Sequence, residues 1–278
     1  MPKQPSTLIS RQPHEFFVGL DSMIECYHNL SYDHSMDFGL QDKTVLVAAA
    51  SQGLGKAIAA QFVAEGAEVY ICARDTERLA ETAQEIGAKG VSCDVTRPEQ
   101  IVQLTETIGK IDILVTNAGG PKPGTTAELN DTDWQQTFDL TFMSAVRLIR
   151  GVLPQMQKQQ WGRIICLTST SVQQPIERLT ASNAIRAAVA NLAKSLANEV
   201  GKDGITVNVI APGMFDTARM QQLYPTANQR SQVQQAIPTH RFGDTNELAA
   251  AVVFLASQQA AYINGVLLPV DGGLTKSL

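Results

Sequence analysis

From residue 43 onward, short apolar segments rich in branched residues alternate with longer segments of helical periodicity. The expected strands are residues 44–49, 67–73, 90–93, 111–116, 162–168, 204–210 and 265–270. The expected helices are residues 54–65, 76–87, 98–109, 131–158, 181–201 and 246–257. Strands separated by helices of this length form parallel crossover units. The sequence therefore predicts a single α/β domain of the Rossmann type, a doubly wound seven-stranded parallel sheet with helices on both faces.

The first expected strand runs into a glycine turn and then a helix, in the stretch TVLVAAASQGLG at residues 44–55. The first backbone N–H groups of a helix have no partner within the helix, and the helix dipole adds partial positive charge there. Glycine allows the backbone to approach a ligand closely. We therefore expect the diphosphate of a nucleotide to bind on this turn.

The composition is that of a soluble globular enzyme, with 44% hydrophobic and 18% charged residues. A net charge of −5 without a run of Lys or Arg argues against nucleic acid as a partner. No apolar stretch reaches the ~18 residues of a membrane span. Cys72 and Cys166 lie in expected buried strands, which favours reduced thiols and a cytoplasmic protein.

Residues 1–41 lack the periodicity of the remaining chain. We expect an N-terminal extension that is flexible, or that comes from an upstream start codon or a vector-derived leader, with Met36 as the natural start. Cys26, His28 and His34 match no standard zinc spacing, so no metal site is expected. The domain then spans residues 42–278, and the segment 213–238 is expected to be a long loop that covers the site as a lid.

Over about residues 37–278 the sequence resembles the short-chain dehydrogenase/reductase family. The family's motifs occur in the family's order, as AAASQGLG (48–55), CARD (72–75), CDV (93–95), TNAGG (116–120), GRIICLTSTS (162–171), SNAIRAAVANLAKSLANEV (182–200), ITVNVIAPG (205–213) and VDGG (270–273). The resemblance implies a nicotinamide dinucleotide cofactor and a homodimer or homotetramer. Apolar residues on more than one side of helices 131–158 and 181–201 fit such a subunit contact.

The resemblance also implies the cofactor-binding residues. They are Ser51, Gly53, Leu54, Gly55, Arg74, Asp94, Val95, Asn117, Ala118, Gly119, Arg186, Pro212, Gly213 and Thr217. The family's first loop glycine is replaced by Ala49. Arg74 follows the second strand, where an acidic residue would bind a ribose 2′-hydroxyl and an arginine favours a 2′-phosphate. We therefore expect NADP(H) to be preferred over NAD(H); the alternative is that Arg74 is only solvated or paired with Asp75.

The catalytic pattern of the family is incomplete in this chain. The family uses a Tyr, a Lys four residues later, a Ser on the fifth strand and an Asn on the preceding helix. Ser169 matches the strand serine, whereas Ser182, Arg186 and Thr141 stand at the Tyr, Lys and Asn positions. A serine hydroxyl is a much weaker acid than a phenol, and an arginine with a pKa above ~12 cannot relay a proton. Cofactor binding is therefore expected to survive better than the acid–base step.

Three interpretations of the site stay open. In the first, hydride transfer persists, and the proton comes from water held by Ser169 and Ser182, or from Glu177, Tyr224 or His240. In the second, the substrate supplies its own acid. In the third, the protein binds NADP without redox chemistry, as a sensor, scaffold or partner subunit. We favour an NADP-dependent oxidoreductase that acts on a carbonyl or alcohol of a small or medium organic molecule.

Overall fold

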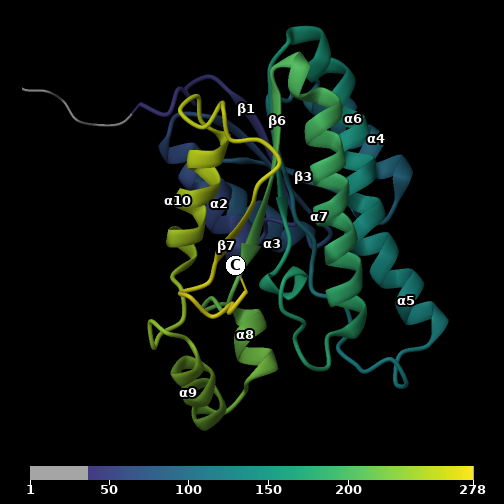
Figure 1. Ribbon diagram of the computed structural model, residues 1–278. Helices are drawn as coiled ribbons and strands as arrows, with labels where there is room; N and C mark the ends of the chain where they lie inside the picture. Colours follow the sequence, from purple (N-terminus) through teal and green to yellow (C-terminus); the bar gives the residue numbers. More distant parts are fainter. Residues whose placement is uncertain (1–36, 278) are drawn as a thin grey trace, which may run out of the picture. The chain divides into compact units, whose positions relative to one another are not determined.

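The computed structural model describes residues 37–277, and its compact unit begins at Phe38. Seven strands form one sheet in the order β3-β2-β1-β4-β5-β6-β7, and every neighbouring pair is parallel (Figure 1). They are β1 (Thr44–Ala48), β2 (Glu68–Ala73), β3 (Lys89–Ser92), β4 (Ile113–Thr116), β5 (Gly162–Leu167), β6 (Ile205–Pro212) and β7 (Leu267–Val270). The chain runs outward from β1 to β3 and returns to β4 on the other side of β1. This is the predicted doubly wound fold, which is confirmed.

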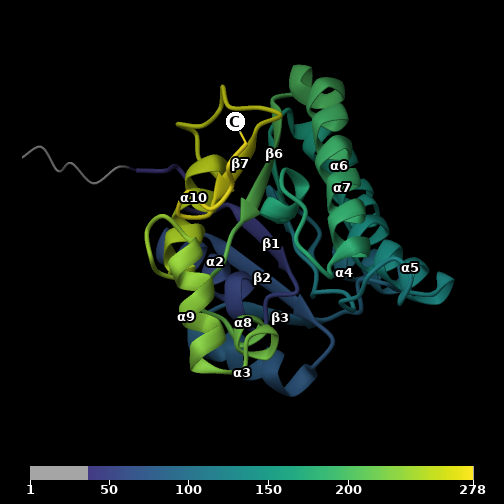
Figure 2. The same ribbon diagram turned by 60° about the horizontal axis from the view of Figure 1, so that its bottom comes forward.

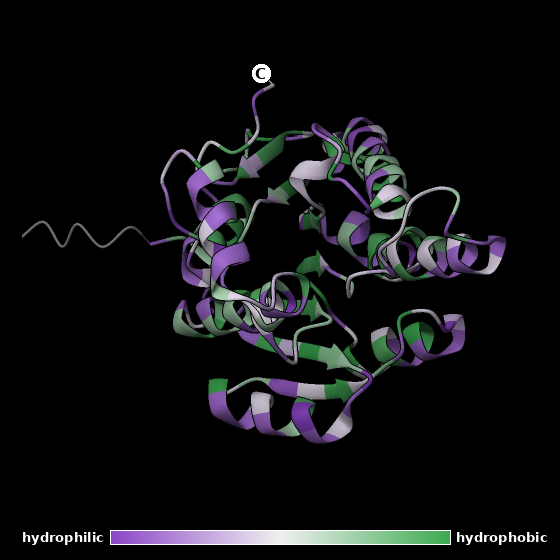
Figure 3. Ribbon diagram, turned by 90° about the horizontal axis from the view of Figure 1, so that it is seen from below, coloured by the Kyte–Doolittle hydropathy of each residue, from purple (hydrophilic) through white to green (hydrophobic). Residues whose placement is uncertain are grey.

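Helices cover both faces of the sheet, each over its own apolar core. One core joins the sheet to α2 (Gly53–Ala64), α3 (Thr76–Ile86) and α10 (Thr245–Ala256). The other core joins it to α4 (Pro98–Ile108), α6 (Ser144–Gln159) and α7 (Thr180–Val200). In Figure 3 the strands are mostly green and the outer sides of the helices mostly purple, as expected when each helix buries one apolar face.

The helix predicted over residues 131–158 is wrong as a single α-helix. The structure has α5 (Asp131–Phe138), a π-helical segment η1 (Asp139–Met143), and then α6. A π turn holds one residue more than an α turn, and a hydrophobic pattern of helical period does not reveal a single such turn. The hydroxyl of Ser144 donates to the Leu140 carbonyl oxygen at this point, a bond of the kind that bends helices.

The segment 213–238, predicted as a long loop, contains two helices, α8 (Ala218–Leu223) and α9 (Ala227–Ala236). Thr217 caps α8 by accepting from the Met220 N–H, and a capping box of Thr226 and Gln229 begins α9. No residue of α9 is buried, so α9 lacks the apolar stripe on which helix prediction depends. In Figure 2, where the carboxyl ends of the strands are turned forward, both helices lie at that end of the sheet.

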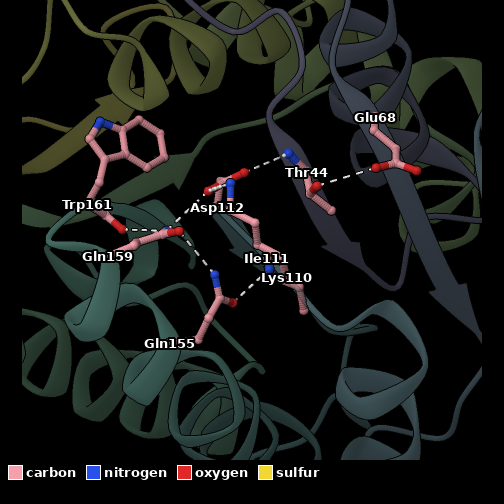
Figure 4. Close-up of polar contacts among 8 residues, drawn as sticks. All are labelled: Thr44, Glu68, Lys110, Ile111, Asp112, Gln155, Gln159 and Trp161. Carbon is pink, nitrogen blue, oxygen red and sulfur yellow. Dashed lines mark hydrogen bonds and ion pairs between the residues drawn. The ribbon is translucent and has the colours of Figure 1, made fainter.

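At the opposite end of the sheet, where the strands begin, a buried carboxylate, Asp112, lies directly before β4 and joins neighbouring elements (Figure 4). Its Oδ2 accepts the Thr44 N–H at 3.1 Å, and its Oδ1 accepts from Gln159 Nε2 at 3.1 Å and lies 3.0 Å from Lys110 Nζ. Gln155 Oε1 accepts the Ile111 N–H at 2.8 Å. These bonds join β1, β4 and α6, so this end of the sheet is structural.

Several expectations concern the limits of the domain. Leu40 is only 1% exposed and packs in the core, so packing begins slightly before the predicted domain start at residue 42. The remaining predictions for residues 1–41, including those for Cys26, His28, His34 and Met36, lie outside the described residues. Cys72, Cys93 and Cys166 are free and buried. Within residues 37–277, no cluster of three His, Cys, Asp or Glu side chains could hold a metal ion, and no helix could cross a bilayer.

Candidate active site

A cavity of about 430 Å³ lies where the central strands end. It is walled by the turn after β1, the segments after β4, β5 and β6, the start of α7, and α8. Twelve of the residues expected in the site line it, namely Gly53, Leu54, Gly55, Asn117, Ala118, Gly119, Ser169, Ser182, Arg186, Pro212, Gly213 and Thr217. The other five, Ser51, Arg74, Asp94, Val95 and Thr141, are not among its lining residues. Ligands of open α/β sheets bind at the carboxyl ends of the strands, because the loops that follow the parallel strands meet there.

The glycine turn leaves the start of α2 open toward this cavity. Gln52 is the N-cap residue and forms no capping hydrogen bond with its side chain. A Cβ on Gly55 would lie 2.7 Å from the Ala49 carbonyl oxygen, so only glycine allows α2 to approach β1 this closely. A Cβ on Gly119 would meet no atom within 4 Å, which leaves space over the loop after β4. Asn117 Nδ2 donates to the Ala49 carbonyl oxygen at 3.2 Å and joins the two loops.

Ala49 has a φ of 49°, in the left-handed region that favours glycine. The resemblance indicated that a glycine is missing at this position, and the backbone still adopts the conformation that a glycine would take freely. The turn therefore keeps its shape at the expense of local strain, which costs a residue with a Cβ about 1–2 kcal/mol.

Two further cofactor candidates lie at the ends of β2 and β3. Arg74 is exposed and forms no hydrogen bond or ion pair with a described residue, while Asp75 pairs with Arg78 at 3.4 Å. Pairing of Arg74 with Asp75 is therefore not observed. Burial opposes ionisation of Asp94, but hydrogen bonds from the Thr96 N–H and hydroxyl, and the charge of Arg74, lower its pKa below the ordinary value. Asp94 is therefore a carboxylate in the field of the Arg74 cation.

The two serines of the cavity are both held as hydrogen-bond acceptors. Ser182 is buried in the first turn of α7, and its Oγ accepts from Arg186 Nε at 3.2 Å. Ser169 Oγ accepts from the Ser171 N–H at 3.1 Å. A hydroxyl that accepts in this way keeps its own hydrogen to donate elsewhere. The structure thus brings together two O–H donors at one cavity.

Arg186 is anchored to the end of β5. Its Nη1 donates to the Thr168 carbonyl oxygen at 2.8 Å and lies 3.5 Å from that of Leu167. Burial and then the positive charge of Arg219 lower the pKa of Arg186 to about 10. This is below the value assumed from the sequence, but the side chain remains a cation at neutral pH.

Arg219, on α8, is a cavity residue that sequence reasoning missed. Its Nη2 donates to the Pro121 carbonyl oxygen at 3.2 Å, so its side chain reaches from α8 to the loop after β4. The signal was available, because Arg219 lies two residues after Thr217 in the segment expected to cover the site.

The sequence offers three proton sources other than water, namely Glu177, Tyr224 and His240. Of these only Tyr224, which follows α8, lines the cavity; Glu177 and His240 are exposed and are not among the lining residues. Thr141 lies in η1, which packs against α7, and its buried hydroxyl has no hydrogen-bond partner among the described residues.

The similarity of this chain to known proteins covers most of the described residues. The family described as Enoyl-(Acyl carrier protein) reductase matches residues 48–275. The 3-oxoacyl-(acyl-carrier-protein) reductase FabG of Vibrio harveyi is 37% identical over 241 residues, which are 84% of this chain and 98% of that protein. L-sorbose reductase from Gluconobacter frateurii, complexed with NADPH and L-sorbose, has a TM-score of 0.83 at 35% identity, covering 87% of this chain and 100% of that chain. YwfH, an NADPH-dependent reductase involved in bacilysin biosynthesis, has a TM-score of 0.83 at 27% identity, covering 86% and 100%.

Proposed function

This chain belongs to the short-chain dehydrogenase/reductase family, and we propose that it is an NADP-dependent oxidoreductase with an atypical proton donor. Its substrate class would be a carbonyl compound or alcohol of small or medium size. When bound, the nicotinamide supplies or accepts a hydride at C4. The observation that carries the proposal is one cavity that joins the open start of α2 to the hydroxyls of Ser169 and Ser182 and the guanidinium of Arg186.

The residues present fit a dinucleotide. The uncapped N–H groups that begin with Gly53 would bind the diphosphate, and Gly119 leaves space beside them. Ser51, Leu54, Gly55, Asn117 and Ala118 would line this half of the cofactor site. Asp94 and Val95 would contact the adenine, and Pro212, Gly213 and Thr217 the nicotinamide amide.

A preference for NADP(H) over NAD(H) is supported by Arg74. Its guanidinium is exposed and unpaired among the described residues, at the end of the strand where the adenosine ribose of a dinucleotide lies. A guanidinium binds phosphate through two parallel hydrogen bonds. L-sorbose reductase and YwfH, both structurally similar to this chain, are NADPH enzymes.

At the reacting carbonyl, this chain would supply hydrogen-bond donors. In reduction, a hydride adds to the carbonyl carbon and a proton to the oxygen, which yields an alcohol. Ser169 and Ser182 would both donate to that oxygen, because each accepts a hydrogen bond within the protein and keeps its own O–H to donate. Arg186 would hold the nicotinamide ribose and place positive charge behind Ser182, and Thr141 would support α7 from η1.

The proton itself would come from Tyr224, directly or through a water molecule. Among the residues that line the cavity, Tyr224 and the two arginines are the only titratable groups. An arginine stays protonated at neutral pH and a serine hydroxyl is a much weaker acid, so the phenol is the best acid at the site.

Two further features belong to this proposal. Phe138, Phe142 and Val146 are only partly buried on one side of the sheet, as are Ala187 and Leu192, which fits a contact in a homodimer or homotetramer. The buried free thiols fit a cytoplasmic protein.

The test is reduction of a panel of ketones and aldehydes with NADPH, by the wild type and by Ser169→Ala, Ser182→Ala and Tyr224→Phe. We expect each serine variant to lose about 100-fold in kcat, as when one oxyanion donor is removed. Tyr224→Phe should lose at least about 100-fold, the typical contribution of a general acid. Tyr262→Phe, a fully exposed tyrosine outside this cavity, is the matched control and should be unchanged.

Each outcome has a distinct meaning. Full activity of Tyr224→Phe would move the proton source to water held by the serines. Full activity of both serine variants would overturn the assigned site. If NADPH raises the melting temperature but no compound is reduced, the protein is a binding module rather than an enzyme.

A further inference from the structure

The cavity contains positive charge and no negative charge. Its lining includes two guanidinium groups, Arg186 and Arg219, and no Asp or Glu. Neither arginine takes part in a salt bridge with a described residue. They lie close enough that Arg219 contributes to the lowered pKa of Arg186, after burial. Two neighbouring cations without a counter-ion among the described residues repel each other, so an anion bound near both would be stabilised by both.

Both arginines retain free donors. A guanidinium has five N–H groups, and Arg219 uses only Nη2, for the Pro121 carbonyl oxygen. Arg186 uses Nε and Nη1, which leaves its Nη2 free. Paired N–H groups of this kind match the two oxygens of a carboxylate.

Arg219 lies on the side of the cavity that α8 and the loop after β4 form. Its guanidinium lies against Gly120, where an added Cβ would be 2.9 Å from Cζ, on the loop after β4. The open N–H groups of α2 lie in a different wall, after β1. Apolar side chains complete the cavity near α7 and α8, namely Leu167, Ile176, Leu179, Met220 and Leu223. A ligand with an organic body and one negative group fits these surroundings.

We propose that this site recognises organic carboxylates, with oxo acids and hydroxy acids as its substrate class, and that Arg219 selects them. This deepens the oxidoreductase proposal and rests on it. Arg219 would bind the carboxylate at the mouth of the cavity. Ser169 and Ser182 would bind the oxygen that is reduced, and Arg186 would add positive charge from the floor.

The test compares acids with their neutral esters. The substrates are phenylglyoxylate and levulinate, each beside its methyl ester, with NADPH and the full chain. We expect the wild type to favour at least one acid over its ester by tenfold or more in kcat/KM. In Arg219→Gln that preference should fall at least tenfold, through a higher KM for the acid. Arg219→Lys should lie between them, because a lysine keeps the charge but not the paired donors.

Two controls separate the possible causes. Arg150→Gln removes one charge from an exposed position on α6 outside the cavity and should keep the preference. NADPH affinity of Arg219→Gln should stay within threefold of the wild type. A large loss of NADPH affinity with an unchanged acid preference would mean that Arg219 serves the cofactor, which overturns the inference. Equal use of acid and ester by the wild type would also overturn it.

A binding measurement separates this inference from the oxidoreductase proposal. Benzoate and benzamide are titrated calorimetrically into the NADP⁺-saturated protein and its Arg219→Gln variant. Tighter binding of benzoate that depends on Arg219, without turnover of any carbonyl compound, would retain the carboxylate site and overturn the enzyme. No difference between benzoate and benzamide, together with equal turnover of acids and esters, would overturn the carboxylate site and retain the enzyme.

Discussion

Replacement of Ala49 by glycine should release strain from the cofactor turn. The left-handed backbone at Ala49, with φ of 49°, costs about 1–2 kcal/mol for a residue with a Cβ. Glycine removes this cost, but its greater conformational freedom in the unfolded chain lowers the free energy of unfolding by about 0.5–1 kcal/mol. Loss of the half-buried methyl group lowers the free energy of unfolding by roughly 0.4 kcal/mol more. At the midpoints of these ranges, the free energy of unfolding should therefore rise by about 0.35 kcal/mol, and Tm by about 1 °C for a domain of this size.

The neighbouring Ala50 supplies the matched control. It is fully buried, and its φ is not positive. Ala50→Gly carries the entropy cost and loses a buried methyl group, together about 1.3–1.8 kcal/mol, without any relief of strain. Tm should fall by about 4–6 °C.

Thermal unfolding of both variants, read by circular dichroism, measures this contrast. NADPH affinity of Ala49→Gly should stay within about twofold, because Asn117 binds the backbone oxygen of residue 49 and not its side chain. If Ala49→Gly loses as much stability as Ala50→Gly, the turn is unstrained and the reasoning is refuted.

Two other predictions concern charges. Arg74→Glu should lower the ratio of NADPH affinity to NADH affinity by at least about tenfold without changing Tm, since one charge-assisted hydrogen bond is worth about 1.5–3 kcal/mol. Both affinities are measured by fluorescence quenching, and equal losses for the two cofactors would contradict the role of Arg74. Hydrogen bonds from Arg241 and from the Asp244 N–H lower the pKa of Glu247 to about 2, so its stabilising contribution is full above about pH 4.5 and is lost as pH falls toward 2. Glu247→Gln should therefore lower Tm slightly at pH 6 and progressively less as the pH falls from about 4.5 toward 2, and a Tm difference that is independent of pH would contradict this.

The sheet could be predicted from the sequence because its central strands are mostly apolar. β1, β5 and β6 are buried along their whole length, and the helices between them carry one apolar face each. The π segment at Asp139–Met143 and the helices α8 and α9 of the segment 213–238 could not be predicted in this way. The first changes the helical period over a single turn, and α9 buries no side chain.

The sequence predicted which segments form the candidate site, but it did not predict the hydrogen bonds between the side chains of the site. The motifs that follow β1, β4, β5 and β6 converge because parallel strands end at one edge. The bond from Arg186 to Ser182 depends on side-chain rotamers, and the approach of Arg219 depends on the path of α8, which the pattern of residues does not encode. The sequence therefore identified the serines and Arg186 as groups of the site, whereas the structure shows which of their hydrogen-bond donors are free.

That difference changes how the replaced tyrosine is understood. Hydride addition to a carbonyl builds negative charge on its oxygen before any proton arrives, and fixed donors aimed at that charge lower the barrier. In the proposed reaction, Ser169 and Ser182 donate to this oxygen, while Arg186 holds Ser182 in the donating role and supplies positive charge. The proton then needs to arrive only at an oxygen that is already stabilised, so its source can lie farther away, at Tyr224 after α8. A site of this kind depends more on its electrostatic field than on a strong acid, and removal of the Arg186 charge should cost more in kcat than removal of Tyr224.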